Sequence, residues 1–144
     1  MAGATVAVAS DHAGFDLKEI LKRDLQEAGH AVLDLGTNST ASVDYPDFGK
    51  AVAEAIASGR VQRGVIICGT GVGISIAANR NPKVRAALAH DVTSARLSRE
   101  HNDANVVAFG ARLIGPETAR EALKVFLATE WAGGRHAGRV AKLS

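Results

Sequence analysis

The sequence predicts an α/β protein: a single three-layer αβα sandwich in which helices cover both faces of a five-stranded parallel sheet. Five short apolar runs alternate with segments whose apolar residues recur at helical spacing, a pattern typical of successive βαβ units. The run at residues 65–67 is continuously apolar, as expected of a strand that is buried on both faces. With 144 residues, we expect one domain, residues 1–144, that is long enough for a full core.

Glycine and proline mark the ends of the predicted elements. Gly29 and Gly59 each follow a periodic segment and are natural helix stops, whereas Pro46 and Pro116 fit the first turn of a helix. We expect strands at residues 5–9, 31–35, 65–67, 84–89 and 106–109. We expect helices at residues 17–28, 46–58, 74–79, 92–100 and 116–127.

The central stretch of the chain carries its only cysteine. Cys68 ends the run at 65–67, and a glycine-rich loop, residues 69–73, leads from it into a helix of small residues. A strand, a glycine loop and a helix in this order place backbone N–H groups around an anion, at the sheet edge where ligands bind. The loop has neither the Gly-Lys-Ser/Thr ending of a P-loop nor the spacing of a dinucleotide fingerprint. Cys68 is either a small buried side chain or a functional thiolate, and its place beside a helix N-terminus favours the thiolate.

Side chains capable of chemistry also follow other predicted strands. Asp11 and His12 follow the first strand, His90 follows the fourth and Arg112 follows the fifth. Since neighbouring parallel strands lie about 4.8 Å apart, several strand ends can face one small ligand. A Rossmann/flavodoxin-like order, with the first strand beside the third, would bring Asp11 close to Cys68. Asp11 and His12 can equally be residues that only cap the start of the next helix.

Two further segments have both a plain and a functional interpretation. His101 and Asn102 precede the last strand, so they should lie at the opposite sheet edge from Cys68. They either form an ordinary turn at a helix terminus or contribute to the site of a neighbouring subunit, and the residues alone favour the turn. The C-terminal tail, residues 131–144, is basic and glycine-rich, and its Arg135 and Arg139 can grip a phosphate or simply keep the chain end soluble. We expect its tryptophan to pack on the domain or on a partner subunit.

The composition excludes several classes of protein. Hydrophobic residues make up 47% and charged residues 22%, as in an ordinary globular protein, and a net charge of +2 is too small to indicate a nucleic-acid partner. No apolar stretch is long enough for a bilayer and no signal peptide is evident, so we expect no membrane partner. A single cysteine excludes an intrachain disulfide framework and favours a cytoplasmic location. No group of histidine, cysteine and aspartate has the spacing of metal ligands, so we expect neither a metal nor another cofactor.

Five motifs of this chain are shared with a known family. They are Ser10–Gly14, Val43–Phe48, Cys68–Gly73, His101–Asn105 and Gly134–Arg139. Through these motifs, in this order and nearly end to end, the chain resembles the type B ribose-5-phosphate isomerases, a family that also contains galactose-6-phosphate isomerase subunits and allose-6-phosphate isomerases. The resemblance implies a metal-independent aldose–ketose isomerase that interconverts ribose 5-phosphate and ribulose 5-phosphate through an enediolate, in the pentose phosphate pathway. An allose 6-phosphate or galactose 6-phosphate isomerase, and a non-catalytic sugar-phosphate binding module, stay open as alternatives.

The resemblance also implies a role for each motif. Cys68 looks like the base that moves a proton between C2 and C1, because isoleucine and serine at residues 74–75 stand in the stretch where some family members carry a glutamate instead. Thr70 looks like the hydroxyl that helps to move protons between O1 and O2. His101, with Asn102 beside it, looks like the group that opens the furanose ring in the other subunit of a dimer.

The remaining residues of the motifs look like substrate contacts. The resemblance implies that the anion hole is formed by Gly69, Gly71, Val72 and Gly73. It implies that Asp11 and Tyr45 contact sugar hydroxyl groups. The implied phosphate ligands are His12, Arg112, Arg135 and Arg139. It implies that Arg112, like His101, reaches the site from the second subunit. We therefore expect a homodimer or a higher homo-oligomer whose active site is shared across the interface.

Overall fold

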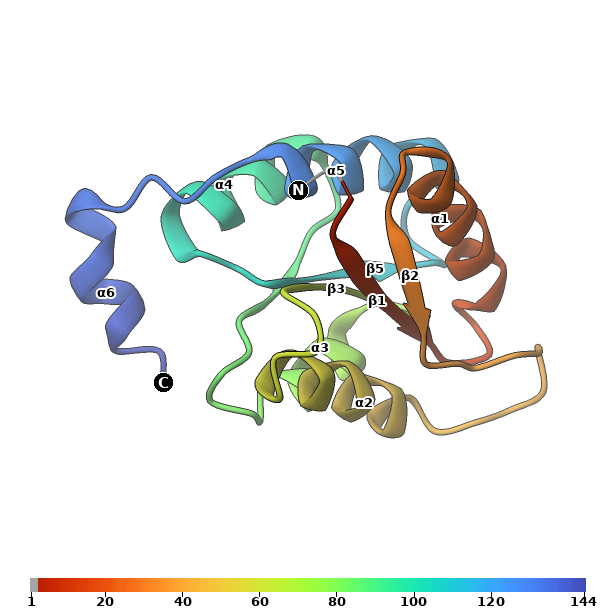
Figure 1. Cartoon of the computed structure of the whole chain (residues 1–144). Coiled ribbons are helices and arrows are strands. Elements are labelled where there is room, and N and C mark those ends of the chain that lie inside the picture. Colours follow the sequence, from red (N-terminus) through yellow and green to blue (C-terminus); the bar gives the residue numbers. More distant parts are fainter. Residues whose placement is uncertain (1–2) are drawn as a thin grey trace.

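The computed structural model describes residues 3–144 and shows a parallel sheet between two layers of helices (Figure 1). The strands are β1 (Thr5–Ser10), β2 (Ala31–Asp34), β3 (Arg63–Cys68), β4 (Ala86–Leu88) and β5 (Val106–Gly110). The helices are α1 (Phe15–Glu27), α2 (Tyr45–Ala57), α3 (Val72–Ala78), α4 (Val92–Asn102) and α5 (Pro116–Ala128), followed by a 3₁₀ turn η1 (Gly134–His136) and α6 (Ala137–Ala141). The predicted α/β class with five parallel strands is confirmed.

The two faces of the sheet carry separate apolar clusters, because successive residues of a strand point to opposite faces. One cluster joins alternate residues of β1, β3 and β5, such as Val8, Ile67 and Phe109, to α1, α4 and α5. The other joins the intervening residues, Cys68 among them, to α2 and α3. Within residues 3–144, no helix is both long enough and apolar enough to cross a membrane.

The strand order is β2-β1-β3-β5-β4, so the first strand lies beside the third, as predicted. Ser10 is opposite Ile67 in the β1–β3 pair, and Cys68 is opposite Gly110 in the β3–β5 pair. The carboxyl ends of these three central strands therefore meet at one edge of the sheet. The short strand β4 lies at the margin of the sheet, next to β5 and not next to β3.

Some element boundaries differ from the predicted ones. Helix α3 begins at Val72 instead of residue 74, because Gly71, with a φ of 77°, turns the chain into the helix at once. Helix α4 extends to Asn102 instead of residue 100, so His101 and Asn102 lie in its last turn. The tail is folded at its end, since η1 and α6 follow Gly133 and extend away from the body of the domain (Figure 1).

Candidate functional site

The sulfur of Cys68 lies at the carboxyl end of β3, against the glycine loop. The backbone N–H of Gly71 donates to its Sγ over 3.2 Å, and the residue is 4% exposed. Cys68 is thus both a member of the apolar cluster under α2 and α3 and a thiol in contact with the loop.

The conformation of the loop after Cys68 is set by a hydrogen bond within the loop and by its packing against the end of β5. Val72 N–H donates to the Thr70 hydroxyl over 3.2 Å, and Thr70 is exposed at the outer side of the loop. A Cβ on Gly110 would lie 2.5 Å from the carbonyl oxygen of Thr70, so a side chain there would push the loop outward. The close pairing of the loop with the end of β5 therefore fixes where its N–H groups point.

Asp11 and His12 form a turn beside the end of β3. Asp11 N–H donates to Ile67 O over 3.2 Å, and the Asp11 carboxylate accepts from Gly14 N–H over 3.1 Å. The expected closeness of Asp11 and Cys68 is confirmed. The alternative that Asp11 is the N-cap of the next helix is wrong, because Gly14 is the N-cap of α1, and the Asp11 carboxylate instead closes the turn before it. His12 Nδ1 accepts from the N–H of Val43 over 3.1 Å, so in the neutral ring the proton is on Nε2.

An ion-pair network lies behind the turn that carries Asp11. Lys18, which is fully buried, places its Nζ 2.8 Å from both carboxylate oxygens of Asp34, and Lys22 donates to Oδ2 over 2.9 Å. Burial acts to raise the pKa of Asp34, but hydrogen bonds from Lys18, the Gly36 N–H and Lys22 outweigh it and hold this pKa below its ordinary value. Gly36 also accepts a backbone hydrogen bond from the last residue of β1 over 2.8 Å. The network therefore supports the backbone directly before Asp11.

Two more of the predicted residues contact the glycine loop within the same chain. A Cβ on Gly69 would lie 3.1 Å from Nη1 of Arg112, and a Cβ on Gly73 would collide with the ring of Tyr45. Arg112 reaches the loop because its N–H donates to Gly69 O over 2.9 Å, just beyond the point where Cys68 pairs with Gly110. The β3–β5 register thus brings Arg112 to the loop of its own chain, and its predicted contact with the site of a second subunit stays a prediction.

His101 and the tail form a second cluster. The ring of His101 stacks on the ring of His136 with centroids 4.6 Å apart, and both line an open hollow of about 340 Å³ together with Arg135. Burial, the nearby His101 and the arginines at 135 and 139 lower the pKa of His136. Nothing in the sequence except its place in the motif Gly134–Arg139 pointed to His136 as a member of this cluster.

The two clusters lie apart within one chain. Helix α4 ends before β5 begins, so His101 is at the amino edge of the sheet, whereas Cys68 is at the carboxyl edge. The structure thus brings Asp11, His12, Cys68, the glycine loop, Tyr45 and Arg112 to one edge, and His101, Asn102 and Arg135 to the other. Arg139 lies in α6 and is exposed. His90 is exposed and precedes Asp91, which caps α4.

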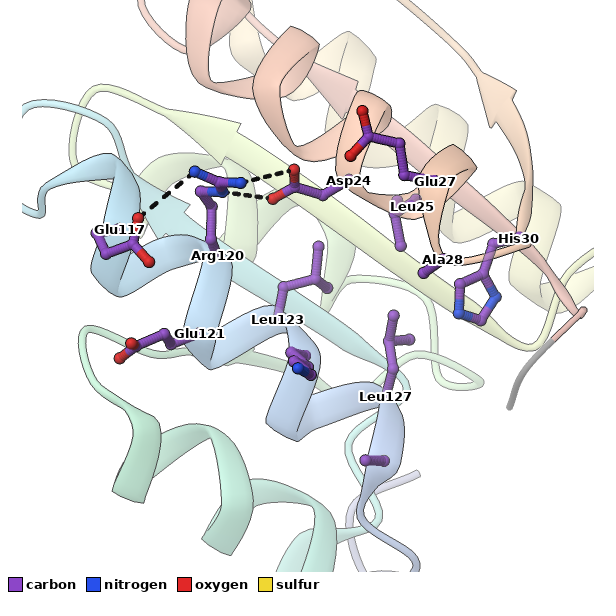
Figure 2. A pocket seen from close by; sticks show the side chains of 12 residues that line it. Asp24, Leu25, Glu27, Ala28, His30, Glu117, Arg120, Glu121, Leu123 and Leu127 are labelled. Atoms are coloured by element: carbon purple, nitrogen blue, oxygen red, sulfur yellow. Dashed lines mark hydrogen bonds and ion pairs between the residues drawn. The ribbon is translucent and has the colours of Figure 1, made fainter.

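A further hollow lies between α1 and α5. Figure 2 shows it between α1 and α5, where Arg120 forms hydrogen bonds of 2.7 and 3.2 Å to Asp24 above a floor that includes Leu25, Leu123 and Leu127. Its volume is about 780 Å³, but none of the expected site residues lines it. Within residues 3–144, no group of three or more His, Cys, Asp or Glu side chains is placed to hold a metal ion.

Comparison with known proteins gives consistent relatives. The chain matches the family model described as Ribose/Galactose Isomerase over residues 6–143. It is 47% identical over 135 residues to ribose-5-phosphate isomerase B of Escherichia coli strain K12, covering 94% of this chain and 91% of that protein. It is 41% identical over 140 residues to D-erythrulose-4-phosphate isomerase of Pectobacterium atrosepticum, covering 96% and 92%.

A solved structure supports the same assignment. Ribose-5-phosphate isomerase B of Clostridium thermocellum superposes with a TM-score of 0.95 at 50% identity, covering 96% of this chain and 94% of that one. The family match spans almost the whole chain, and the fold and the glycine loop described above lie within it. This chain therefore belongs to the ribose/galactose isomerase family and is a sugar-phosphate isomerase.

Proposed function

We propose that the protein interconverts ribose 5-phosphate and ribulose 5-phosphate through an enediolate, without a metal. The observation that carries the proposal is the environment of Cys68, whose sulfur lies 3.2 Å from a loop N–H while Arg112 packs against the same loop. A base, a donor for developing negative charge and a cation for phosphate are thus gathered around one loop. The name of the Escherichia coli relative supports the five-carbon substrate.

Ring opening comes first, because the C2 proton becomes acidic only once C1 is an aldehyde. The bond between C1 and the ring oxygen O4 breaks, the C1 hydroxyl loses its proton and O4 gains one. We assign the proton transfer to His101, with Asn102 beside it, as an acid–base pair supplied by a second subunit. The separation of His101 from Cys68 within one chain supports this assignment, since one subunit alone cannot apply both groups to the same sugar.

Proton transfer between carbons follows. The Cys68 thiolate takes the proton from C2, the C–H electron pair forms the C1=C2 double bond, and the negative charge collects on O1. The loop N–H groups, such as that of Gly71, stabilise this charge. The Thr70 hydroxyl relays the proton of O2 to O1, and the Cys68 thiol then returns its proton to C1, which leaves the carbonyl at C2.

Phosphate binding holds the open-chain sugar in position. His12 can donate from Nε2, because its Nδ1 already accepts from a backbone N–H. Arg112 offers a guanidinium fork beside the loop, and Arg135 and Arg139 offer two more from the exposed tail. Asp11 and Tyr45 lie at the same sheet edge and are assigned to sugar hydroxyl groups.

A homodimer would complete the site. Val72 and Ile76 on α3, Leu88 at the end of β4 and Leu113 after β5 are all exposed, although they are large and apolar. Leu88 also lies against Gly71 of the glycine loop, so this apolar surface adjoins the Cys68 site. Exposed apolar side chains next to a half-complete site fit a surface that a second copy covers.

Steady-state isomerisation tests the proposal. Ribose 5-phosphate and allose 6-phosphate are compared, with and without EDTA, on the wild type, Cys68→Ala and Cys68→Ser. We expect pentose turnover that survives EDTA, and a fall in kcat of about 10²–10⁴ in both variants, because each removes the base. Calorimetric binding of ribose 5-phosphate should change little, because the phosphate ligands remain.

The outcomes separate the alternatives. An unchanged kcat in Cys68→Ala would show that the thiol is not the base. A preference for the hexose would keep the chemistry and assign the protein to six-carbon substrates instead. Binding of both sugars without turnover by the wild type would leave a sugar-phosphate binding module.

A further inference from the structure

The residue directly after His101 and Asn102 has an unusual backbone. Asp103 ends α4 with a φ of 48° and a ψ of 43°, in the left-handed region. It is the only non-glycine residue with positive φ in the described part of the chain. Such a conformation is sparsely populated and persists where surrounding contacts hold it.

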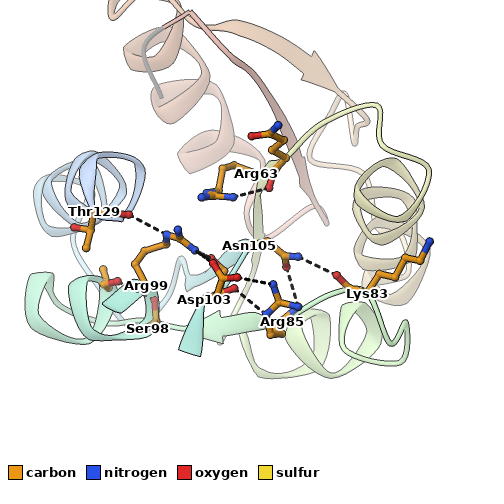
Figure 3. Close-up of polar contacts among 11 residues, drawn as sticks. Arg63, Lys83, Arg85, Ser98, Arg99, Asp103, Asn105 and Thr129 are labelled. Atoms are coloured by element: carbon orange, nitrogen blue, oxygen red, sulfur yellow. Dashed lines mark hydrogen bonds and ion pairs between the residues drawn. The ribbon is translucent and has the colours of Figure 1, made fainter. Parts of the chain in front are cut away.

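Two arginines hold Asp103 from opposite sides (Figure 3). Arg85 Nε donates to the Asp103 carbonyl oxygen over 2.8 Å, and its Nη2 donates to Oδ2 over 3.3 Å. Arg99 Nη1 donates to Oδ1 over 2.8 Å and to Ala104 O over 2.7 Å. Both the backbone and the carboxylate of Asp103 are therefore fixed.

The clamp formed by Arg85, Asp103 and Arg99 is itself anchored to rigid elements. The backbone N–H of Arg85 donates to Asn105 Oδ1 over 2.8 Å, at the entry to β5. Arg99 is 3% exposed, and its Nε donates to Thr129 O over 3.0 Å, at the end of α5. The end of α4 is thus tied to the sheet and to the segment that begins the tail.

The geometry points to this clamp as the device that positions His101 for ring opening, an inference that rests on the proposed function. His101 and Asn102 occupy the last turn of α4, and the clamp holds the residue at which that turn ends, through its carbonyl oxygen and both of its carboxylate oxygens. Displacement of a catalytic group by about 1 Å can cost about a hundredfold in rate. The two arginines would act on His101 through Asp103 and the end of α4, so the clamp residues are positioning residues.

Ribulose 5-phosphate separates ring opening from proton abstraction. Its carbonyl is at C2 and its O5 carries the phosphate, so it has no free hydroxyl for a five-membered ring and stays open. In D₂O, the Cys68 step exchanges a C1 proton of bound ribulose 5-phosphate without any ring chemistry. Net conversion to cyclic ribose 5-phosphate requires both steps, so the ratio of C1 exchange to net conversion reports on the ring step alone.

We would measure this ratio by NMR for the wild type, His101→Ala, Arg85→Met and the matched control Arg120→Met. The control removes an arginine that pairs with Asp24 on the surface between α1 and α5. Arg85→Met should lower net conversion by about ten- to a hundredfold while C1 exchange changes little, so that the ratio rises as in His101→Ala. Asp103→Asn is a second variant, for use if Arg85→Met folds poorly. Asparagine tolerates the left-handed conformation but lacks the charge, so Asp103→Asn should also raise the ratio of C1 exchange to net conversion.

Combining the substitutions gives a second readout. In the His101→Ala background, Arg85→Met should add less than about a twofold loss, because residues that act through one another are not additive. A raised ratio in His101→Ala but not in Arg85→Met or Asp103→Asn would overturn the clamp and leave the role of His101 intact. An unchanged ratio in His101→Ala would overturn both, and a wild type that neither exchanges C1 nor isomerises would overturn the proposed function itself.

Discussion

Gly71→Ala tests the geometry of the glycine loop most directly. Gly71 has a φ of 77°, a left-handed conformation that costs an alanine about 1–2 kcal/mol. A Cβ there would also lie 2.5 Å from Leu88 Cδ1 and 2.9 Å from the carbonyl carbon of Phe109. Leu88 is exposed and can move, but Phe109 is backbone in a buried strand, and such overpacking costs about 1–3 kcal/mol. We expect a total loss of about 2–5 kcal/mol in the free energy of unfolding.

Gly59→Ala is the matched control for this substitution. Gly59 has a φ of 81°, and nothing lies within 4 Å of the Cβ that alanine would add. The control should therefore lose only the backbone part, about 1–2 kcal/mol. Urea unfolding followed by circular dichroism measures both variants, at one protein concentration because assembly would add to stability. Equal destabilisation of the two variants would refute the close approach of Gly71 to the Phe109 backbone.

The same pair of variants tests the contact between the loop and the thiol. Shifting Gly71 moves the N–H that donates to Cys68 Sγ, and loss of one such donor typically lowers kcat by about a hundredfold. Gly59 lies at the end of α2, so Gly59→Ala should leave kcat unchanged. Wild-type kcat in Gly71→Ala would show that this N–H does not support the reaction.

Three further predictions concern other contacts. Asp34→Ala should lower the free energy of unfolding more than Lys18→Met in urea unfolding, because it leaves the fully buried Lys18 ammonium with only the partly exposed Glu19 carboxylate, 3.0 Å away, whereas Lys18→Met leaves Asp34 paired with Lys22. The reverse order would contradict the network. Burial and neighbouring positive charge lower the folded-state pKa of His136 from 6.5, so the stability that its neutral ring contributes is complete above pH 6.5 and is lost as the pH falls through the lowered pKa. Trp131 fluorescence, followed against pH, should report this loss. If the same fluorescence change persists in His136→Phe, another group causes it. Arg139→Ala should raise KM for ribose 5-phosphate with little change in kcat, whereas an effect on kcat alone would mean that the tail positions a catalytic group.

Much of the fold was predictable because its signals are local. Apolar runs, helical spacing and the glycines and prolines at element ends indicated five parallel strands with helices between them, and the structure confirms this. The closeness of Asp11 to Cys68 also followed, once β1 was placed beside β3. The boundaries near Gly71 and Asn102 were wrong by about one turn or less, because backbone turns and hydrogen bonds set them and periodicity does not.

The sequence by itself determined the α/β class, the glycine loop after Cys68 and the motifs that identify the family, because each is written in consecutive residues. Only the tertiary structure decided that Arg112 packs on the loop of its own chain, that His101 stacks on His136, and that Arg85 grips Asp103 across 18 positions of sequence. These contacts depend on strand register and on how α4 and the tail meet the sheet. Residues far apart in the chain carry no local signal of their pairing, so their geometry emerges only when the sheet assembles.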